Sequence, residues 1–260
     1  MLNSHGSGHR VGAVDSAPGA DTARPWTEAE FVAELRAVGT ARYHHRHPFH
    51  LSMNRGALTA DQVRGWIANR FHYQLLIPRK DAAILANCTD REIRRSWLRR
   101  IVDHDGKPGT EGQDGGIEAW LGLGLAAGLT RAELLDERHV LPGVRFAADA
   151  YLEFVRRAPW PIAIASSLTE LFAPDLMSER LAAFERHYTF VKPAGLAYFR
   201  SRLTLAPADA TEALAIVLTH CRSAATQAEA VHALELKCAL LWAMLDAMDY
   251  AYGGGAARGS

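Results

Sequence analysis

Hydrophobic residues recur at three- and four-residue spacing along most of the chain, which is the period of one face of an α-helix. The series Phe31, Val32, Leu35 and Val38 shows this spacing near the start. Clear alternation of apolar and polar residues, which would indicate half-buried strands, is absent. The predicted helical segments are residues 27–40, 60–87, 90–103, 115–127, 142–158, 161–172, 175–186, 194–204, 208–222 and 224–250. The pattern predicts an all-α bundle of seven or more helices.

Capping residues and prolines mark where these helices begin. A Ser or Thr followed three residues later by Glu or Gln is the pattern of a capping box, in which each side chain bonds the other residue's backbone N–H. The chain has this pattern at Thr27/Glu30, Thr59/Gln62, Thr89/Glu92 and Thr130/Glu133. Proline is tolerated in the first turn of a helix, because the N–H groups there have no partner within the helix. The prolines that predict further starts are Pro142, Pro174, Pro193 and Pro207, and Pro78 predicts a kink.

The segments between residues 26 and 252 follow one another without a linker rich in Gly, Ser or Pro, so we expect a single all-α domain there. Residues 1–25 are rich in Gly, Ser, Ala and Asp, and we expect a disordered leader. They lack the apolar run of a signal peptide. Residues 253–260 are expected to form a flexible tail.

Charge and cysteine content narrow the class of protein. Lys plus Arg and Asp plus Glu each total 29, so nothing in the charge favours nucleic acid as a partner. No stretch reaches the roughly 18 apolar residues of a membrane span. Cys88, Cys221 and Cys238 are odd in number and widely spaced, which indicates buried reduced thiols rather than disulfides or zinc ligands. We therefore expect a soluble, cytoplasmic protein.

Polar side chains gather on one face of the segment 60–87. Trp66, Arg70, Tyr73, Gln74 and Ile77 follow the three- and four-residue spacing of that face. A cation, a phenol and an amide would together suit a ligand that has carboxylates and a ring. The alternative is that they are solvated residues at the edge of a half-exposed helix.

His104 lies between two acids, Asp103 and Asp105, and is followed by Gly106, which predicts the end of a helix. Acids lying close to the imidazole would raise its pKa, whereas burial would lower it. The residue is a candidate for proton transfer, and a structural helix cap is the alternative.

Other charged residues fall on apolar or shared helix faces. Lys237 lies beside a core stripe, so its ammonium must reach outward or meet an anion. Glu170 lies among apolar residues and needs a partner, for which a buried salt bridge is one possibility. Tyr198 and Arg202 are four residues apart and share a face, while Arg200 points elsewhere.

Two clusters are given no functional role. The first is the basic run Arg91, Arg94, Arg95, Arg99 and Arg100. No aromatic residues alternate with these arginines, so we expect a solvated helix face. The second is the histidine group His44, His45, His47 and His50. Pro48 interrupts the helix that would pair two of them, and no nearby acid completes a ligand set, so no metal site is expected.

Eight stretches between about Phe31 and Tyr252 are distinctive in their residues and in their order along the chain. They are YHHRHPFH, GWIANRFHYQLLIPRKDAAILANC, RIVDHDG, GGIEAWLGLG, ERHVLPGVRFAADAYLEFVRRA, SSLTELFAP, YFRSRL and ALLWAMLDAM. Together they resemble the pyrroloquinoline quinone synthase family. The resemblance implies a haem-oxygenase-like helical bundle, a homodimer, and an oxidase that needs no haem, flavin or metal. It implies that O₂ oxidises a reduced bicyclic precursor, which bears several carboxylates, as the last ring closes and hydrogen peroxide is released.

The resemblance also implies roles for particular residues. Positions that bind substrate carboxylates or line the pocket match Arg70, Arg180, Arg202 and Lys237. Further active-site positions match Tyr43, His44, Tyr73, Gln74, Tyr151 and Glu170. The group around the bound oxygen species matches His104, Tyr198 and Arg202.

Within that group, His104 is expected to exchange a proton with peroxide. Arg202 is expected to stabilise the reduced oxygen species electrostatically, with Tyr198 as a hydrogen-bond partner. Glu170 is the candidate base for proton removal during ring closure and oxidation.

The chain departs from the family's pattern at a few positions. Met177 stands where the family has a histidine, and a thioether offers no proton and accepts hydrogen bonds weakly. His72 replaces a usual aromatic residue, and residues 110–113 look like a short insertion. Met177 supports one alternative, a catalytically impaired relative that carries the precursor or the finished cofactor.

A haem-oxygenase-like di-iron oxidase is the other alternative, and it would require paired metal-ligand motifs on two helices. Such motifs are not found in the sequence. The resemblance further leaves room for a separate carrier protein that removes the product.

Overall fold

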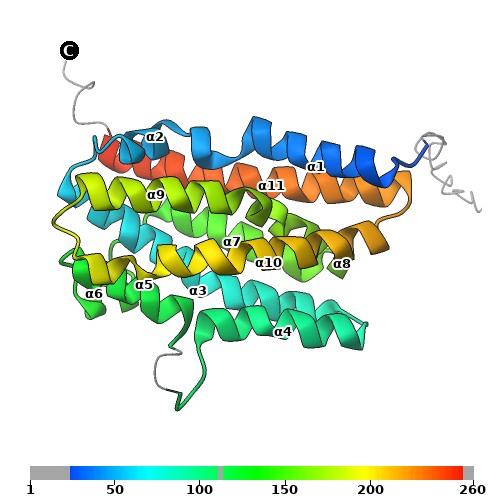
Figure 1. The fold of residues 1–260 in the computed structure, drawn as a ribbon, viewed down its shortest axis with the longest axis horizontal. Helices are drawn as coiled ribbons and strands as arrows, with labels where there is room; N and C mark the ends of the chain where they lie inside the picture. Colours follow the sequence, from blue (N-terminus) through cyan, green and yellow to red (C-terminus); the bar gives the residue numbers. More distant parts are fainter. Residues whose placement is uncertain (1–23, 111–113, 254–260) are drawn as a thin grey trace, which may run out of the picture.

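The computed structural model describes residues 24–110 and 114–253. Its long helices run side by side along the longest axis of the molecule (Figure 1). They are α1 (Glu28–Arg42), α3 (Ala60–Asn87), α4 (Arg91–Asp105), α7 (Pro142–Arg157), α9 (Ala173–His187), α10 (Ala197–His220) and α11 (Ala224–Met248). The shorter elements are η1 (His44–Arg46), α2 (Pro48–Asn54), α5 (Gly115–Ala126), α6 (Arg131–Leu135), α8 (Trp160–Ala165), η2 (Ser166–Phe172), η3 (Pro193–Leu196) and the π-helical η4 (Asp249–Gly253).

Every element in the described residues is helical, so the predicted all-α class is confirmed. Residues 1–23 of the expected leader, 254–260 of the expected tail, and 111–113 of the expected insertion lie outside the described residues.

The helix starts follow the capping pattern with one exception. The boxes at Thr27, Thr59 and Thr130 are all formed. The box predicted at Thr89 is wrong, because Asp90 caps α4 by accepting the backbone N–H groups of Glu92 and Ile93. Aspartate is as good an N-cap as threonine, so the residue nearer the helix takes the position.

The prolines divide into two kinds. Pro142 and Pro174 lie in the first turns of α7 and α9, as predicted, and Pro193 opens η3. Pro207 does not start a helix but lies inside α10, so the segments predicted at 194–204 and 208–222 form one helix. Pro207 lies on the exposed face of α10, while the opposite face, which includes Ala206 and Ala210, is buried, and this packing outweighs the lost backbone hydrogen bond.

An aromatic cluster fixes one end of the bundle. Trp66 of α3 packs on Trp120 of α5 and Phe184 of α9, with ring centroids 5.4 and 5.9 Å apart. Tyr198 of α10 meets Trp120 edge to face at 4.8 Å. Edge-to-face contacts of this kind hold rings in defined orientations, so the cluster positions the phenol of Tyr198.

Two glycines let α5 begin close to the end of α4. Gly115 has a φ of 78°, and a Cβ there would lie 2.4 Å from the backbone nitrogen of Gly106. At Gly116 a Cβ would lie 3.4 Å from Tyr198 and 3.5 Å from His104. Only a small residue with access to positive φ fits the first position, so the glycine pair brings α5 against these two side chains.

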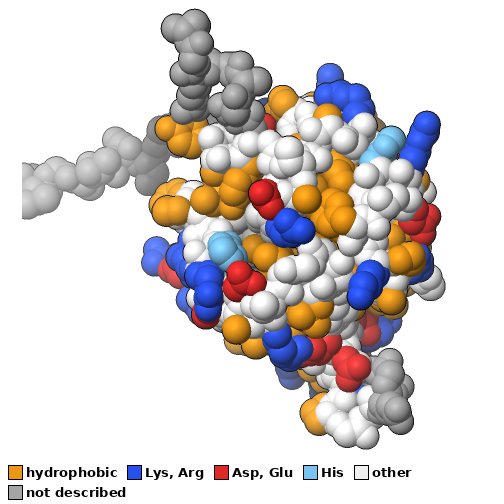
Figure 2. Space-filling model, turned by 90° about the vertical axis from the view of Figure 1, so that its left-hand side faces the viewer, with side chains coloured by type: hydrophobic (Ala, Val, Ile, Leu, Met, Phe, Trp, Pro, Cys, Tyr) orange, Lys and Arg blue, Asp and Glu red, His pale blue; other side chains and the backbone are white. Residues whose placement is uncertain are grey.

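The face in Figure 2 shows basic and acidic side chains mixed with apolar ones, and neither sign of charge dominates it. Among the described residues, no helix has both the length and the apolar sequence that crossing a membrane requires. All three cysteines are free thiols and buried, as predicted.

Candidate active site

Two neighbouring cavities share part of their lining. The inner cavity, of about 70 Å³, is lined by Tyr43, His44, Arg70, Tyr73, Ile77, His104, Thr169, Glu170, Ala173, Leu176, Met177, Tyr198, Arg202 and Leu241. The outer cavity, of about 640 Å³, lies between α4, α5 and α10. Both cavities are lined by His104, Tyr198 and Arg202.

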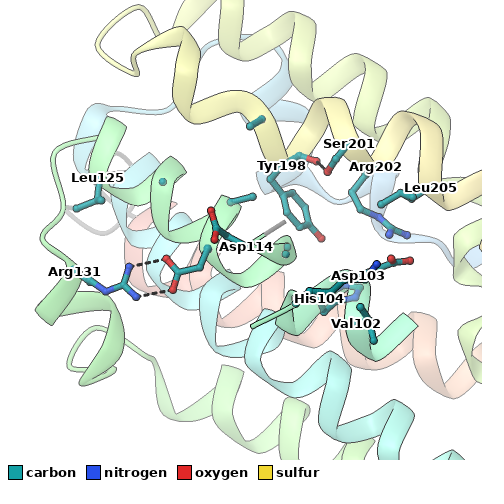
Figure 3. Close-up of a pocket in the computed structure, with 17 residues that line it drawn as sticks. Val102, Asp103, His104, Asp114, Leu125, Arg131, Tyr198, Ser201, Arg202 and Leu205 are labelled. Atoms are coloured by element: carbon teal, nitrogen blue, oxygen red, sulfur yellow. Dashed lines mark hydrogen bonds and ion pairs between the residues drawn. The ribbon is translucent and has the colours of Figure 1, made fainter. Parts of the chain in front are cut away.

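Figure 3 shows the side chains that line the outer cavity. His104 and Asp103 come from α4, and Tyr198 and Arg202 project toward them from α10. A pocket for a drug-sized ligand has roughly 300–1,000 Å³, so the inner cavity alone is too small for a bicyclic molecule. Such a ligand requires the side chains between the cavities to move, or it extends into the outer one.

The inner cavity is bordered by basic groups packed on tyrosine rings. The Arg70 guanidinium lies 4.0 Å from the ring centroid of Tyr73. The Lys237 ammonium lies 3.4 Å from the ring centroid of Tyr151 and donates to the Tyr73 hydroxyl. Burial, followed by the nearby Arg70 charge, holds the pKa of Lys237 well below its usual value. Burial also raises the pKa of both tyrosines, so these phenols stay protonated.

Arg180 adjoins the same region from α9. Its guanidinium donates to Nδ1 of His50 at 3.3 Å and lies 3.9 Å from the sulfur of Met177. Burial, together with the charge of Arg70, lowers its pKa to about 10. The pKa of His44 is also held well below 6.5 by burial and by His50 and Arg180. Both histidines are therefore neutral at pH 7, since burial and Arg180 also lower the pKa of His50.

We name Arg70, Arg180 and Lys237 the cation pocket. Within the part of the chain that the structure describes, none of the three forms an ion pair with a carboxylate. Buried polar atoms nearby also lack hydrogen-bond partners within residues 24–110 and 114–253, namely Nδ1 of His44, Nε2 of Gln74 and Nε of Arg180. Buried polar groups are normally satisfied, so this arrangement is suited to an anionic ligand with several acceptors.

The second group of predicted residues surrounds the junction of the cavities. The Tyr198 hydroxyl donates to Oε1 of Gln74 at 2.9 Å. Among the residues that the structure describes, the one acceptor at Nδ1 of His104 is the Arg100 carbonyl, 3.0 Å away, so Nδ1 carries the proton. Burial, followed by the charge of Arg202, lowers the pKa of His104 to about 4.

His104 is therefore neutral at pH 7, with a lone pair on Nε2. Of the two effects that the sequence left open, burial prevails over the neighbouring acids. The side chain is suited to accept a proton rather than to donate one.

Glu170 forms the buried ion pair that the sequence allowed as an alternative. Arg100 donates to both of its carboxylate oxygens, one of them at 2.9 Å. Burial would raise the pKa of Glu170, but Arg100 and Arg202 outweigh burial and lower the pKa to about 2. With its pKa held this low Glu170 is a weak base, and its role in proton removal stays a prediction. A carboxylate held so firmly ionised serves as a fixed negative charge.

The solvated basic face predicted for α4 is wrong at Arg100, and Arg94 is half-buried, donating to the Cys88 carbonyl at 2.8 Å. Arg91, Arg95 and Arg99 are exposed, but Arg100 has a relative exposure of 1%. The sequence carried a signal for this, since Arg100 and His104 are four residues apart and share a helix face.

Other predicted placements agree with the structure or need refinement. Tyr198 and Arg202 do share a face, and Arg200 points outward to Glu185 at 2.9 Å. Four predicted residues do not line the inner cavity, namely Gln74, Tyr151, Arg180 and Lys237. Arg180 instead lines a smaller cavity together with His44 and Arg70. Across residues 24–110 and 114–253, no three His, Cys, Asp or Glu side chains come together as a metal-ligand group.

A family model described as the TENA/THI-4/PQQC family matches residues 32–247. The chain therefore belongs to the TENA/THI-4/PQQC family. It is 55% identical over 222 residues to a protein of Klebsiella pneumoniae named pyrroloquinoline-quinone synthase, covering 85% of this chain and 87% of that one. A protein of the same name from Pseudomonas putida is 54% identical over 230 residues, covering 88% and 90%. The resemblance stated from the sequence is confirmed.

Solved structures agree on the fold. A domain of unknown function with a haem-oxygenase-like fold from Shewanella denitrificans has a TM-score of 0.68 at 14% identity, covering 90% of this chain and 96% of that one. A TenA homolog from Pseudomonas syringae pv. tomato has a TM-score of 0.66 at 15% identity, covering 85% and 92%. The haem-oxygenase-like bundle is confirmed.

Proposed function

We propose that this chain is an oxidoreductase that catalyses the last step of pyrroloquinoline quinone formation. It closes the final ring of a reduced bicyclic precursor and oxidises the product with O₂, releasing hydrogen peroxide. The names of the relatives support the reaction. The observation in the structure that carries it is the cation pocket. Its three basic side chains form no ion pair with a carboxylate among the described residues, and Arg70 lines the same cavity as His104, Tyr198 and Arg202.

The cation pocket provides binding groups for a precursor with several carboxylates. Arg70 and Arg180 can each bind a carboxylate with two parallel hydrogen bonds. An anion beside Lys237 would favour its charged form and so oppose the effect of burial on its pKa. Neutral His44, with its Nδ1 unpartnered, adds a further hydrogen-bonding group at the same cavity.

His104, Tyr198 and Arg202 are suited to the oxygen-dependent steps. In each step the precursor loses two electrons and two protons, and one O₂ takes them up to become hydrogen peroxide. The precursor is thus its own reductant, and we propose that no resident cofactor is needed. Arg202 stabilises the anionic reduced oxygen, Tyr198 is a hydrogen-bond partner, and Nε2 of His104 accepts a proton in transit.

The resemblance extends the proposal to the assembly and its location. We propose a homodimer located in the cytoplasm, with a separate carrier protein able to take up the product. The three buried free thiols are compatible with a reducing compartment. Sedimentation of the purified protein tests the dimer.

The test is oxygen uptake by protein treated with a chelator and shown by elemental analysis to be free of metal. With purified precursor, we expect O₂ consumption, peroxide release and the quinone's absorbance. If the treated protein were inactive and iron restored it, the proposal would be wrong and the di-iron alternative right. That alternative finds no clustered ligand set in the described residues.

Met177 supports the second candidate, a relative that binds the precursor or the cofactor without converting it. Its thioether lines the inner cavity and can neither donate nor accept a proton there. Precursor binding without oxygen uptake would favour this carrier function.

A further inference from the structure

Asp209 lies on α10, seven residues after Arg202, so the two residues share one face of the helix about 10.5 Å apart along its axis. The side chain is buried, with a relative exposure of 3%. Oδ2 accepts a hydrogen bond from Nη2 of Arg202 at 3.1 Å. The other oxygen, Oδ1, lies 3.6 Å from Nη1 of Arg100 and 3.7 Å from Nη2 of Arg99.

These contacts belong to a chain of alternating charges, which we name the balanced network. Its members are Lys80, Asp81, Arg100, Glu170, Arg202 and Asp209. Lys80 lies 2.5 Å from Asp81, and Asp81 lies 3.6 Å from Nε of Arg100. Three cations and three anions are present, so the network is neutral as a whole.

Asp209 is the only hydrogen-bond acceptor of Arg202 in the described residues. Glu170 competes for the same nitrogen, with Oε1 at 4.0 Å from Nη2. We propose that Asp209 is a positioning residue, which holds the guanidinium of Arg202 by one nitrogen and keeps it from closing onto Glu170. The remaining donors, on Nε and Nη1, then stay directed to the site where O₂ is reduced. The inference rests on the proposed function of that site.

Removal of the charge has a defined consequence. In Asp209→Asn the amide keeps the volume but can no longer bind Arg202 as an ion pair. The guanidinium is then free to approach Glu170, whose other cationic partner is Arg100. A shift of about 1 Å in a catalytic group can cost up to about 100-fold in rate. Binding of the precursor's carboxylates depends on the cation pocket instead.

The kinetic test compares Asp209→Asn with Glu212→Gln. Glu212 lies one turn further along α10, binds Arg99 at 2.8 Å and does not contact Arg202. We expect Asp209→Asn to lower kcat for oxygen uptake by about ten- to a hundred-fold with KM for the precursor within about two-fold. Glu212→Gln is expected to resemble the wild type. The loss should disappear in an Arg202→Ala background.

An unchanged kcat, an equal loss in Glu212→Gln, or additive losses with Arg202→Ala would overturn the proposal. If Asp209→Asn does not fold, Asp209→Glu takes its place, because it keeps the charge and moves it by one methylene. A reduced kcat is then expected, and an unchanged kcat overturns the proposal.

Guanidinium NMR gives a readout that does not depend on turnover. In the wild type, the two Nη groups of Arg202 should exchange slowly by rotation about the Cζ–Nε bond. The signals are assigned by their loss in Arg202→Lys. In Asp209→Asn this rotation should accelerate. An unchanged rate would show that Asp209 does not hold the guanidinium of Arg202. A wild-type protein without oxygen uptake would refute the proposed function. The NMR measurement would still show whether Asp209 holds the guanidinium of Arg202.

Discussion

The balanced network and the cation pocket lie side by side and treat buried charge in opposite ways. In the network every cation has a carboxylate, as in the pair of Arg100 with Glu170. In the cation pocket Arg180 and Lys237 have only neutral partners among the described residues. Burying an ion costs several kcal/mol, and a close counter-charge offsets much of that cost.

This difference in charge pairing assigns positioning of side chains to the balanced network and ligand binding to the cation pocket. The network fixes side-chain positions without needing a ligand, and Arg202 belongs to it. The cation pocket remains electrostatically unfavourable until an anion enters, and the lowered pKa values of Arg180 and Lys237 report this. Carboxylates of a substrate would relieve the repulsion, so binding energy is concentrated in the pocket and orientation in the network.

The largest effect on stability should come from removing one cation of the balanced network. Arg100→Met leaves Glu170 and Asp209 with one cation fewer and is expected to lower the free energy of unfolding by about 3–5 kcal/mol. The matched change Arg180→Met removes a buried cation that has no carboxylate and should leave stability unchanged or raised. Urea denaturation at pH 7 measures both. Equal destabilisation by the two variants would contradict the distinction between the regions.

Acid should weaken the protein through its buried neutral histidines. The folded pKa of His104 is about 4, below the roughly 6.5 of an unfolded histidine. Its contribution is therefore fully present above pH 6.5 and is lost as the pH falls toward 4. The loss amounts to about 3 kcal/mol for this residue. His44 and His50 act in the same direction.

Denaturation curves between pH 7.5 and 4.5 test this, with His104→Gln as the comparison. The variant should lose less stability than the wild type over that range. Parallel pH profiles for the two proteins would show that His104 does not titrate as its burial requires.

Affinity should respond most to the cation pocket. Arg180→Met is expected to weaken binding of the precursor by about 2 kcal/mol, roughly thirty-fold, because charge-assisted hydrogen bonds are lost. Calorimetric titration without oxygen measures binding alone. Arg200→Met is the control, since Arg200 pairs with Glu185 at the surface. A similar loss in the control would mean that the effect is not specific to the pocket.

Sequence periodicity was sufficient for most helices and for Arg70 and Lys237 of the cation pocket, because a helix face is encoded within a few residues, whereas Arg180 came only from the family resemblance. Arg70, Tyr73 and Gln74 were found in this way. The balanced network was not found, because its pairs join residues such as Arg100 and Glu170 that are 70 positions apart. Asp209 was further hidden by Pro207, which predicted a helix start where α10 continues.

The smallest expected effect concerns Met177, the position where the resemblance leads us to expect a histidine. The side chain is buried in α9, lines the inner cavity and lies 3.9 Å from Nη1 of Arg180. Because η2 ends at Phe172 and α9 begins at Ala173, Glu170 and Met177 are not on one continuous helix, yet both line the cavity.

Met177→His should add a proton acceptor beside an unbalanced cation. The Arg180 charge should keep the imidazole neutral at pH 7, as it helps to do for His50. An added contact of about 1 kcal/mol corresponds to roughly a five-fold increase in the rate of a late oxidation step, or a change in its pH dependence. Rapid-mixing traces of both proteins from pH 6 to 9 measure it. Superimposable late phases at every pH would show that proton transfer at this site runs through His104 without help from position 177.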